Sequence, residues 1–378
     1  MISSWGFVLV ASKKIKLIEP VIGKEELNRV WDVLKSGWLA EGAMVKDFEA
    51  KFARYVNAKH GIATCNCTLA IELALRALGV GRGCEVIVPD FTHPGTADAV
   101  IWVGAEPVFV DVDLSSYNID TDRLEEAITK KTKCIIPISW GGNPLNMGSI
   151  RELKKKYGLY IVEDAACGAG AEYDGQKTGE MADATCFSFH PRKVITTGEG
   201  GMVTTNDDTV AEVARSLKDF GEGVVDGKAE FVRCGTNYSM SDVLAAIGLA
   251  QLEKAEAIIN KRIELAKNYN ELLSKVDGIK IPVKNQKAKH TYQTYAVYVE
   301  NGLRDVLLKS LREMNIEAQI GTYALHLQPI FKNVRHGNDL GNSEKLYQNL
   351  LALPMCHSMT YETQEYVVSQ IKRLMKMH

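Results

Sequence analysis

The sequence predicts an α/β protein, with a large domain built on a mostly parallel sheet between layers of helices and a smaller α+β domain after it. The chain has 378 residues, which exceeds what one ordinary hydrophobic core accommodates. Short apolar segments alternate with helical patterns from about residue 60 to residue 205, and a helical pattern over residues 241–276 is long enough to join two domains. We therefore expect an N-terminal arm over residues 1–15, a large domain over residues 16–255 and a small domain over residues 256–378.

The large domain begins with helical patterns over residues 24–36 and 46–56, separated by a glycine-bounded loop over residues 37–42. Short, continuous apolar strands are expected over residues 61–64, 85–89, 107–111, 134–138, 159–163, 185–189 and 202–205. Helices are expected over residues 69–78, 94–103, 121–128, 149–157 and 208–218. Such an alternation is typical of a parallel sheet that is covered on both faces. A glycine-rich loop over residues 220–235 follows, and the small domain adds a strand over residues 292–299 and helices over residues 303–314, 343–350 and 363–376.

The amino-acid composition favours a globular protein and argues against nucleic-acid-binding and membrane-spanning proteins. Apolar residues make up 46% and charged residues 24% of the chain, which is typical of a globular protein in water. The net charge of −2 gives no basic surplus for nucleic acid, and no apolar run is long enough to span a bilayer. The eight cysteines are scattered and show no metal-ligand spacing, so we expect reduced thiols, no metal site and a cytoplasmic location.

The segment around Lys193 is the most informative part of the sequence. An apolar strand over residues 185–189 is interrupted by His190-Pro191, because proline has no N–H for the strand ladder. Lys193 follows this break and precedes a glycine-rich turn over residues 198–201. A lysine that is desolvated between strands loses its proton more easily and becomes a nucleophile. A lysine in an ordinary surface loop explains this segment alone equally well, because loops collect charge.

Other polar residues also follow the expected strands. Thr68, His93 and Asp164 lie at strand ends or in the turns there, as Lys193 does. In parallel sheets, ligands bind at the carboxyl ends of the strands. Taken singly, Asp164 and Thr68 are more often helix caps, and His93 is more often a surface histidine. Their shared placement is what favours a common site.

These residue types match the needs of pyridoxal 5'-phosphate (PLP). A lysine amine can form a Schiff base, and the Asp164 carboxylate can keep a ring nitrogen protonated so that the ring takes up electrons. His93 is flat and can cover a ring face. Asn66-Cys67-Thr68 opens a helix, whose N-terminus binds phosphate readily, and Ser188 offers a second hydroxyl, although alone it is more often a satisfied buried hydroxyl.

The sequence also resembles the DegT-type family of PLP-dependent sugar aminotransferases. The segments that carry the resemblance are Gly37–Gly42, Cys67-Thr68, Val88–Thr96, Gly104–Val112, Val162–Ala166, Phe187–Lys193, Thr197–Gly201, Asn237–Met240 and His326–Pro329. The resemblance implies the aspartate-aminotransferase-like fold type I and a homodimer whose active sites lie between subunits. Three residues differ from those common in the family: Cys67 replaces Gly or Ala, Cys167 replaces Gln or His, and Ser239 replaces Arg.

The resemblance assigns roles to individual residues. Lys193 would be the Schiff-base lysine, Asp164 would contact the pyridine nitrogen and His93 would stack on the ring. The phosphate would be held by the group comprising the Cys67 and Thr68 amides, Ser188, and Asn237 from the partner subunit. His326 and Trp38 would contact the substrate.

The reaction expected from this resemblance moves an amino group from L-glutamate to a keto sugar, in particular a nucleotide-linked keto-deoxysugar. An alternative within the same chemistry is a cyclitol ketone, an amino-hydroxybenzoate precursor or a keto-octulosonate. A different class is a PLP-binding regulatory protein without turnover. The intact pair of Lys193 and Asp164 argues against this class, because a binding protein does not need both.

Overall fold

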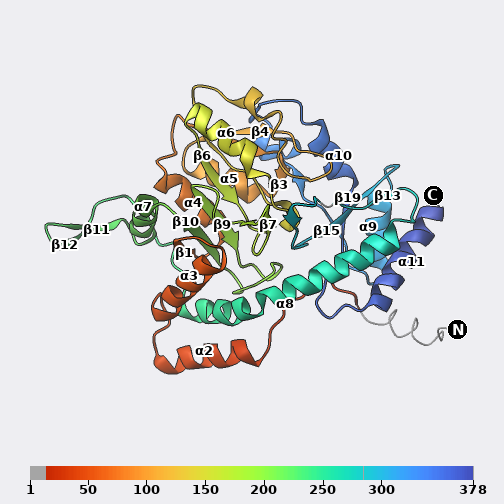
Figure 1. Cartoon of the computed structure of the whole chain (residues 1–378), viewed down its shortest axis with the longest axis horizontal. Coiled ribbons are helices and arrows are strands. Elements are labelled where there is room, and N and C mark those ends of the chain that lie inside the picture. Colours follow the sequence, from red (N-terminus) through yellow and green to blue (C-terminus); the bar gives the residue numbers. More distant parts are fainter. Residues whose placement is uncertain (1–13, 284, 378) are drawn as a thin grey trace.

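The structure, a computed structural model, describes residues 14–283 and 285–377 and confirms the α/β architecture (Figure 1). Its main sheet has eight strands, seven of which run in one direction, whereas β10 runs antiparallel to both of its neighbours. In spatial order these strands are β1 (His60–Thr64), β10 (Gly201–Thr205), β9 (Ala184–Ser188), β6 (Tyr160–Asp164), β5 (Thr132–Ile135), β2 (Glu85–Pro89), β4 (Glu106–Val110) and β18 (Arg335–His336).

Helices cover both faces of this sheet. One face packs on α4 (Cys67–Ala77), α5 (Pro94–Trp102) and α7 (Asp208–Lys218). The other face packs on α3 (Ala43–Tyr55), α6 (Met147–Tyr157) and the first half of α8 (Asp242–Leu273). Successive residues of β2 show why the strand is apolar throughout: Val86 and Val88 enter one core, and Ile87 between them enters the opposite core.

The 32-residue helix α8 joins the two halves of the molecule (Figure 1). Ser241 caps it, accepting a hydrogen bond from the Leu244 amide at 3.4 Å. Leu249 packs in the core beside the main sheet, whereas Leu265 and Tyr269 pack in the core of the C-terminal part. The same rigid helix therefore contributes to both cores.

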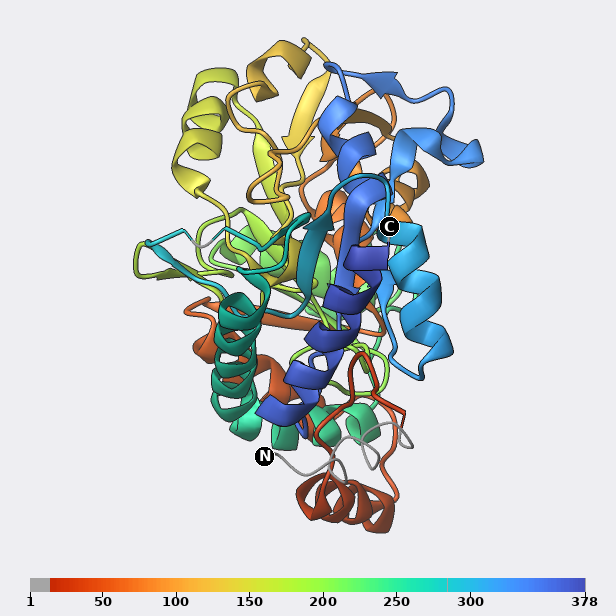
Figure 2. The ribbon, with the colours of Figure 1, turned by 90° about the vertical axis from the view of Figure 1, so that its right-hand side faces the viewer.

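The C-terminal part is built on a four-stranded antiparallel sheet. Its order is β13 (Ile279–Lys280), β15 (Tyr295–Val299), β19 (Leu350–Leu353) and β16 (Gln319–Ile320). The helices α9 (Arg304–Glu313) and α11 (Tyr361–Met377), blue in Figure 2, share its core. This part also contains α10 (Gly341–Asn349). Its strand β14 (Ala288–Lys289) pairs with β7 (Glu172–Tyr173), which precedes α8 in the chain and pairs in turn with β8 (Gln176–Lys177).

Two short strands connect the C-terminal part to the main sheet. β17 (Tyr323–Ala324) pairs with β3 (Phe91–Thr92), which directly follows β2, and β18 extends the main sheet beside β4. These pairings bring His326 close to the carboxyl end of β2. The chain after α8 therefore contributes backbone to the large sheet as well as forming its own core.

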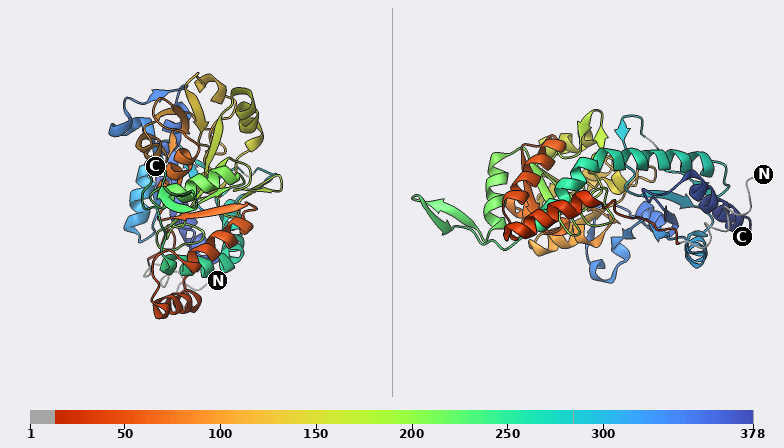
Figure 3. Two further views of the ribbon diagram at one scale, coloured as in Figure 1. Left: turned by 90° about the vertical axis from the view of Figure 1, so that its left-hand side faces the viewer. Right: turned by 90° about the horizontal axis from the view of Figure 1, so that it is seen from below.

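Two expected elements differ from the structure. The helix expected over residues 121–128 is a short 3-10 helix, η1 (Leu124–Ala127). The glycine-rich loop expected over residues 220–235 contains a projecting hairpin of β11 (Glu222–Val225) and β12 (Lys228–Phe231), seen in Figures 1 and 3. Its turn is Asp226-Gly227, with φ angles of 50° and 78°, and such paired positive φ values match the twist of a two-residue hairpin.

The first helix of the described chain is α2 (Lys24–Ser36), which packs on α8. The apolar residues that predicted this helix do not face the core: Leu27, Trp31 and Leu34 are exposed, and Val33 is buried instead. Within residues 14–283 and 285–377, every helix is too short or too polar to cross a lipid bilayer.

Candidate active site

Lys193 lies in a loop between β9 and β10 whose base is closed by backbone hydrogen bonds. The Phe189 amide donates to the Gly200 carbonyl at 2.9 Å, and the Thr197 amide donates to the Phe189 carbonyl at 3.0 Å. Within the loop, the Lys193 amide donates to the His190 carbonyl at 2.8 Å, which forms a turn. The strand break predicted at His190-Pro191 therefore exists, and it places Lys193 at the carboxyl end of β9.

The Lys193 ammonium is half-buried and donates a hydrogen bond to the Cys167 sulfur, with Nζ and Sγ 3.3 Å apart. Desolvation acts to lower the pKa of Lys193, but Cys167, Cys67 and Asp164 favour the charged form and outweigh it. The pKa of Lys193 is therefore raised above its ordinary value. Burial alone would favour the free amine, but the sulfur and carboxylate groups around Lys193 act in the opposite sense.

Asp164 is the last residue of β6 and is buried. The Thr96 hydroxyl donates to Asp164 Oδ2 at 2.7 Å, and the Ala166 amide donates to Oδ1 at 3.0 Å. Thr96 Oγ1 in turn lies 3.2 Å from Thr92 Oγ1. The Thr96 hydroxyl on α5 and the Ala166 amide in the turn after β6 thus fix the orientation of the Asp164 carboxylate. Thr96 was not predicted as a site residue, although it lies in the helix turn that His93 begins.

His93 is the N-cap of α5, and its Nδ1 accepts a hydrogen bond from the Gly95 amide at 3.2 Å. With Nδ1 as the acceptor, a neutral ring carries its proton on Nε2. The pKa of His93 is lowered, because partial desolvation and the nearby charge of Lys193 both disfavour the imidazolium. His93, Lys193 and Asp164 are within electrostatic reach of one another, so the structure brings these three predicted residues together.

The N-terminus of α4 forms the next part of the site. Asn66 caps the helix and accepts from the Leu69 amide at 2.9 Å, while the Ala70 amide donates to the Asn66 carbonyl at 3.1 Å. The amides of Cys67 and Thr68 precede the first intrahelical donor, Ala70, and are oriented to bind an anion. Electrostatic coupling between Cys67 and both Lys193 and Asp164 places this N-terminus at the same site.

Glycines allow the site to close around this helix. A Cβ atom on Gly201 would lie 2.5 Å from the Asn66 backbone, and a Cβ atom on Gly95 would lie 2.7 Å from the Thr68 hydroxyl. Gly201 pairs with Ser188 in the ladder between β10 and β9, so Ser188 lies one strand away from the α4 N-terminus. The Ser188 hydroxyl also accepts a long bond from the His190 amide at 3.4 Å.

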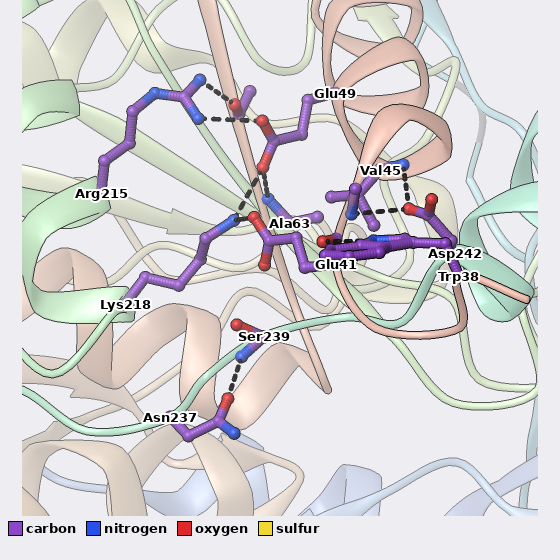
Figure 4. A network of polar contacts seen from close by, with 12 residues as sticks. Trp38, Glu41, Val45, Glu49, Ala63, Arg215, Lys218, Asn237, Ser239 and Asp242 are labelled. Carbon is purple, nitrogen blue, oxygen red and sulfur yellow. Dashed lines mark hydrogen bonds and ion pairs between the residues drawn. The ribbon is translucent and has the colours of Figure 1, made fainter.

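Asn237 and Trp38 are both exposed, and Figure 4 shows their surroundings. Asn237 Oδ1 accepts from the Ser239 amide at 2.9 Å, and the Trp38 indole donates to the Glu41 carbonyl at 3.1 Å. Among the residues that the structure describes, neither side chain has a hydrogen bond to Lys193 or Asp164. Within one chain they are therefore not part of the Lys193 cluster.

A buried ionic network lies beside Asn237. The ammonium of Lys218 is buried and contacts Glu41 at 2.6 Å and Glu49 at 3.0 Å, and Arg215 contacts Glu49 at 2.9 Å. Figure 4 shows the Glu41 carboxylate between Lys218 and the segment of Asn237 and Ser239. This network fixes the loop over residues 37–42 against the C-terminal end of α7 and against α3.

His326 is held by a buried carboxylate that the sequence analysis did not identify. Asp90, which has no exposed surface, accepts from the His326 amide at 2.8 Å and contacts His326 Nδ1 at 2.7 Å. The pKa of His326 is raised, mainly through its hydrogen bond with Asp90. His326 thus connects the C-terminal part to the end of β2.

The residues gathered around Lys193 fit PLP. They offer an amine, a buried carboxylate oriented by two hydrogen bonds, a flat ring, and helix amides beside a hydroxyl. These are the groups needed for an aldehyde, a pyridine nitrogen, a ring face and a phosphate.

Comparison with known proteins agrees with this chemistry. The model of the DegT/DnrJ/EryC1/StrS aminotransferase family matches residues 20–372. The chain is 34% identical to GDP-perosamine synthase of Caulobacter vibrioides, covering 96% of this chain and 98% of that protein. It is also 34% identical to UDP-4-amino-4-deoxy-L-arabinose–oxoglutarate aminotransferase of Shewanella sediminis, covering 97% and 99% of the two chains.

Solved structures show the same fold with its cofactor. A putative sugar aminotransferase of Streptococcus pneumoniae is known in PLP and PMP forms. The PMP form superposes with a TM-score of 0.90 at 27% identity, covering 97% of this chain and 98% of that chain. The predicted fold, family and cofactor are therefore confirmed.

Proposed function

The chain belongs to the DegT/DnrJ/EryC1/StrS aminotransferase family and is a PLP-dependent transaminase, and on this premise we propose that it moves the amino group of L-glutamate to a nucleotide-linked keto-deoxysugar. Two relatives support a nucleotide-linked sugar as the acceptor, because one is named for a GDP-linked and the other for a UDP-linked amino sugar. The second name also contains oxoglutarate, the keto acid that glutamate becomes when it gives up its amine.

One observation carries the proposal for this chain. Lys193, Asp164 and His93 come from different elements of the fold and converge at the carboxyl ends of β6 and β9. The N-terminus of α4, with the Cys67 and Thr68 amides, lies beside them. This arrangement supports covalent attachment, ring protonation and phosphate binding at one site.

Each residue then has a physical role. When bound, PLP supplies an electrophilic aldehyde and a ring that accepts electrons. Asp164, oriented by Thr96 and Ala166, holds a proton on the ring nitrogen, because an ionised carboxylate stabilises that charge. Lys193 Nζ would hold the cofactor as a nucleophilic anchor, and as a free amine it would move a proton at the substrate carbon.

The remaining groups position the cofactor. His93 covers the ring face and, because its pKa is lowered, stays neutral near pH 7. The phosphate is held by the amides of Cys67 and Thr68 and by the Ser188 hydroxyl. A helix N-terminus adds a favourable interaction with negative charge.

The active enzyme is proposed to be a homodimer in which Asn237 completes the phosphate site of the partner and Trp38 and His326 contact the sugar. The exposure of Asn237 and Trp38 supports this role, because neither joins the Lys193 cluster of its own chain. Large exposed apolar residues also favour association: Leu27, Trp31 and Leu34 on α2, and Val224 and Phe231 on the hairpin.

Mixed dimers test the shared site. Lys193→Ala and Asn237→Ala are each expected to be inactive as homodimers. When the two variants are mixed and allowed to exchange subunits, one site of each heterodimer carries both native residues, so activity should return in part. No return of activity, with heterodimers demonstrated by native mass spectrometry, would contradict the assignment of Asn237.

The substrate is tested with glutamate as donor and a panel of ketones as acceptors. We expect release of 2-oxoglutarate with a nucleotide-linked keto-deoxysugar, and much slower release with the same sugar lacking the nucleotide or with a cyclitol ketone. Asp164→Ala is the matched control and should reduce turnover with every acceptor. Equal rates with and without the nucleotide would show that the nucleotide is not recognised, and turnover with the cyclitol ketone alone would replace the proposed acceptor.

A further inference from the structure

Cys167 occupies a turn directly after the buried carboxylate of Asp164. The Ala166 amide donates to Asp164 Oδ1 at 3.0 Å, which fixes the start of this turn. The Cys167 sulfur then accepts from Lys193 Nζ at 3.3 Å. Of the residues that favour the charged form of Lys193, Cys167 is the one whose side chain has a direct hydrogen bond to the amine.

We propose that Cys167 is a positioning residue for Lys193: its sulfur holds the amino group in place as an ammonium and restrains its conversion to the free amine that reacts with an aldehyde. This inference rests on the proposed role of Lys193 as the anchoring nucleophile.

The physical reason is a competition between burial and the sulfur contact. Desolvation favours the neutral amine, whereas a hydrogen-bond acceptor in contact with the ammonium favours the charged form. The second effect prevails here, because the pKa of Lys193 is raised even though desolvation is the largest single influence on it. Replacing Cys167 with a residue that has no acceptor leaves the desolvation of Lys193 in place and removes the hydrogen bond that opposes its effect on the pKa.

Other ionisable groups also face Lys193 and define the background of the experiment. They are Asp164 from β6, Cys67 from α4, His93 from α5 and His190 from the same loop as Lys193. All of them stay in place when Cys167 alone is substituted. A change in the titration of Lys193 is then attributable to the sulfur.

The test measures the amine directly and needs no sugar substrate. Full-length protein stripped of its cofactor is pulsed with an amine-acetylating reagent across a pH series, and mass spectrometry reports the modified fraction of Lys193. In Cys167→Ala, which has no hydrogen-bond acceptor, half-maximal modification should move to lower pH, with several-fold more modification of Lys193 at neutral pH than in the native protein. Cys167→Ser keeps an acceptor and should show a smaller shift. Recapture of PLP, trapped by borohydride, should accelerate in the same sense.

Cys84→Ser is the matched control, because Cys84 precedes β2 at the end of that strand opposite the site. In this variant the modification of Lys193 should depend on pH as it does in the native protein. Circular dichroism identifies folded variants, and where Cys167→Ala does not fold, Cys167→Val, which also lacks an acceptor, takes its place. A folded Cys167→Ala or Cys167→Val with the native pH dependence would overturn the role of Cys167. Borohydride trapping that persists in Lys193→Ala would instead overturn the assignment of Lys193 itself.

Discussion

Glu163, the residue before Asp164, is a buried carboxyl group whose ionisation should control stability between acidic and neutral pH. It is 1% exposed in β6, and the Ser139 hydroxyl donates to its Oε1 at 2.7 Å. Desolvation, with the nearby charge of Asp164, raises the pKa of Glu163 from 4.5 to about 7, and the bond from Ser139 offsets only part of this. At neutral pH the fold therefore contains a carboxyl group that is only partly ionised.

The size of the effect follows from the two pKa values. Because the folded pKa lies above the unfolded one, the contribution of Glu163 to stability is fully present below pH 4.5 and is lost as the pH rises through about 7. Each pH unit between the two pKa values corresponds to about 1.4 kcal/mol. Ionisation of Glu163 should thus remove about 3 kcal/mol from the free energy of unfolding at alkaline pH.

Glu163→Gln tests this reasoning, since glutamine keeps the acceptor for Ser139 and has no charge. Urea unfolding of the cofactor-loaded protein at several pH values should show the native protein losing about 2.5 kcal/mol more than the variant between pH about 5 and pH about 8.5. Glu313→Gln, on the exposed surface of α9, is the matched control. Parallel stability curves for the native protein and Glu163→Gln would refute the argument.

Three further predictions concern residues that support the site. Thr96→Val removes the hydroxyl that donates to Asp164 and should lower kcat by roughly 10-fold to 100-fold at unchanged PLP affinity, because hydrogen bonds to charged groups contribute about 1.5–3 kcal/mol. Thr96→Ser keeps the hydroxyl and should restore kcat. A native kcat in Thr96→Val would be evidence against the positioning role of Thr96. Asp90→Asn removes the partner that raises the pKa of His326, so it should destabilise the protein more at pH about 5.5 than at pH about 9 in thermal melts; equal losses would contradict the ion pair. Gly201→Ala places a Cβ atom 2.5 Å from the backbone of Asn66, the N-cap of α4, and should weaken PLP binding by about tenfold or more in equilibrium titrations. Native affinity for PLP in this variant would show that the N-terminus of α4 is not part of the phosphate site.

The sequence predicted the order of strands and helices well because most of them are buried on a regular pattern. The strand β2 and the helix α7 have the predicted bounds, and α8 begins after the predicted cap at Ser241. The segment over residues 121–128 failed because its apolar residues Leu124 and Ala127 are three apart, a spacing that also fits one turn of 3-10 helix.

Missed features depended on information that periodicity does not contain. The hairpin over residues 222–231 has no alternating apolar pattern, and Asp226-Gly227 was the available signal for its turn. The apolar spacing in α2 predicted a helix correctly but not its direction, since Leu27, Trp31 and Leu34 point away from the core.

The residues of the candidate site were likewise predicted from the sequence only in part. Lys193, Asp164 and His93 were predicted because each follows a strand, and strand ends gather at one edge of a parallel sheet. Thr96 and Asp90 were missed because their roles depend on side-chain contacts across elements, to Asp164 and to His326. The raised pKa of Lys193 was missed because it depends on Cys167, whose sulfur meets the amine only in the folded chain.

The measurement that most directly tests the account is the site of covalent attachment of PLP. The protein loaded with PLP is reduced with borohydride, digested and sequenced by mass spectrometry, alongside Lys193→Ala treated in the same way. We predict that the reduced cofactor is attached to Lys193 and that the variant, although folded, yields no labelled peptide. A label on any other lysine of the native protein, or a labelled Lys193→Ala, would contradict the assignment on which the proposed function rests.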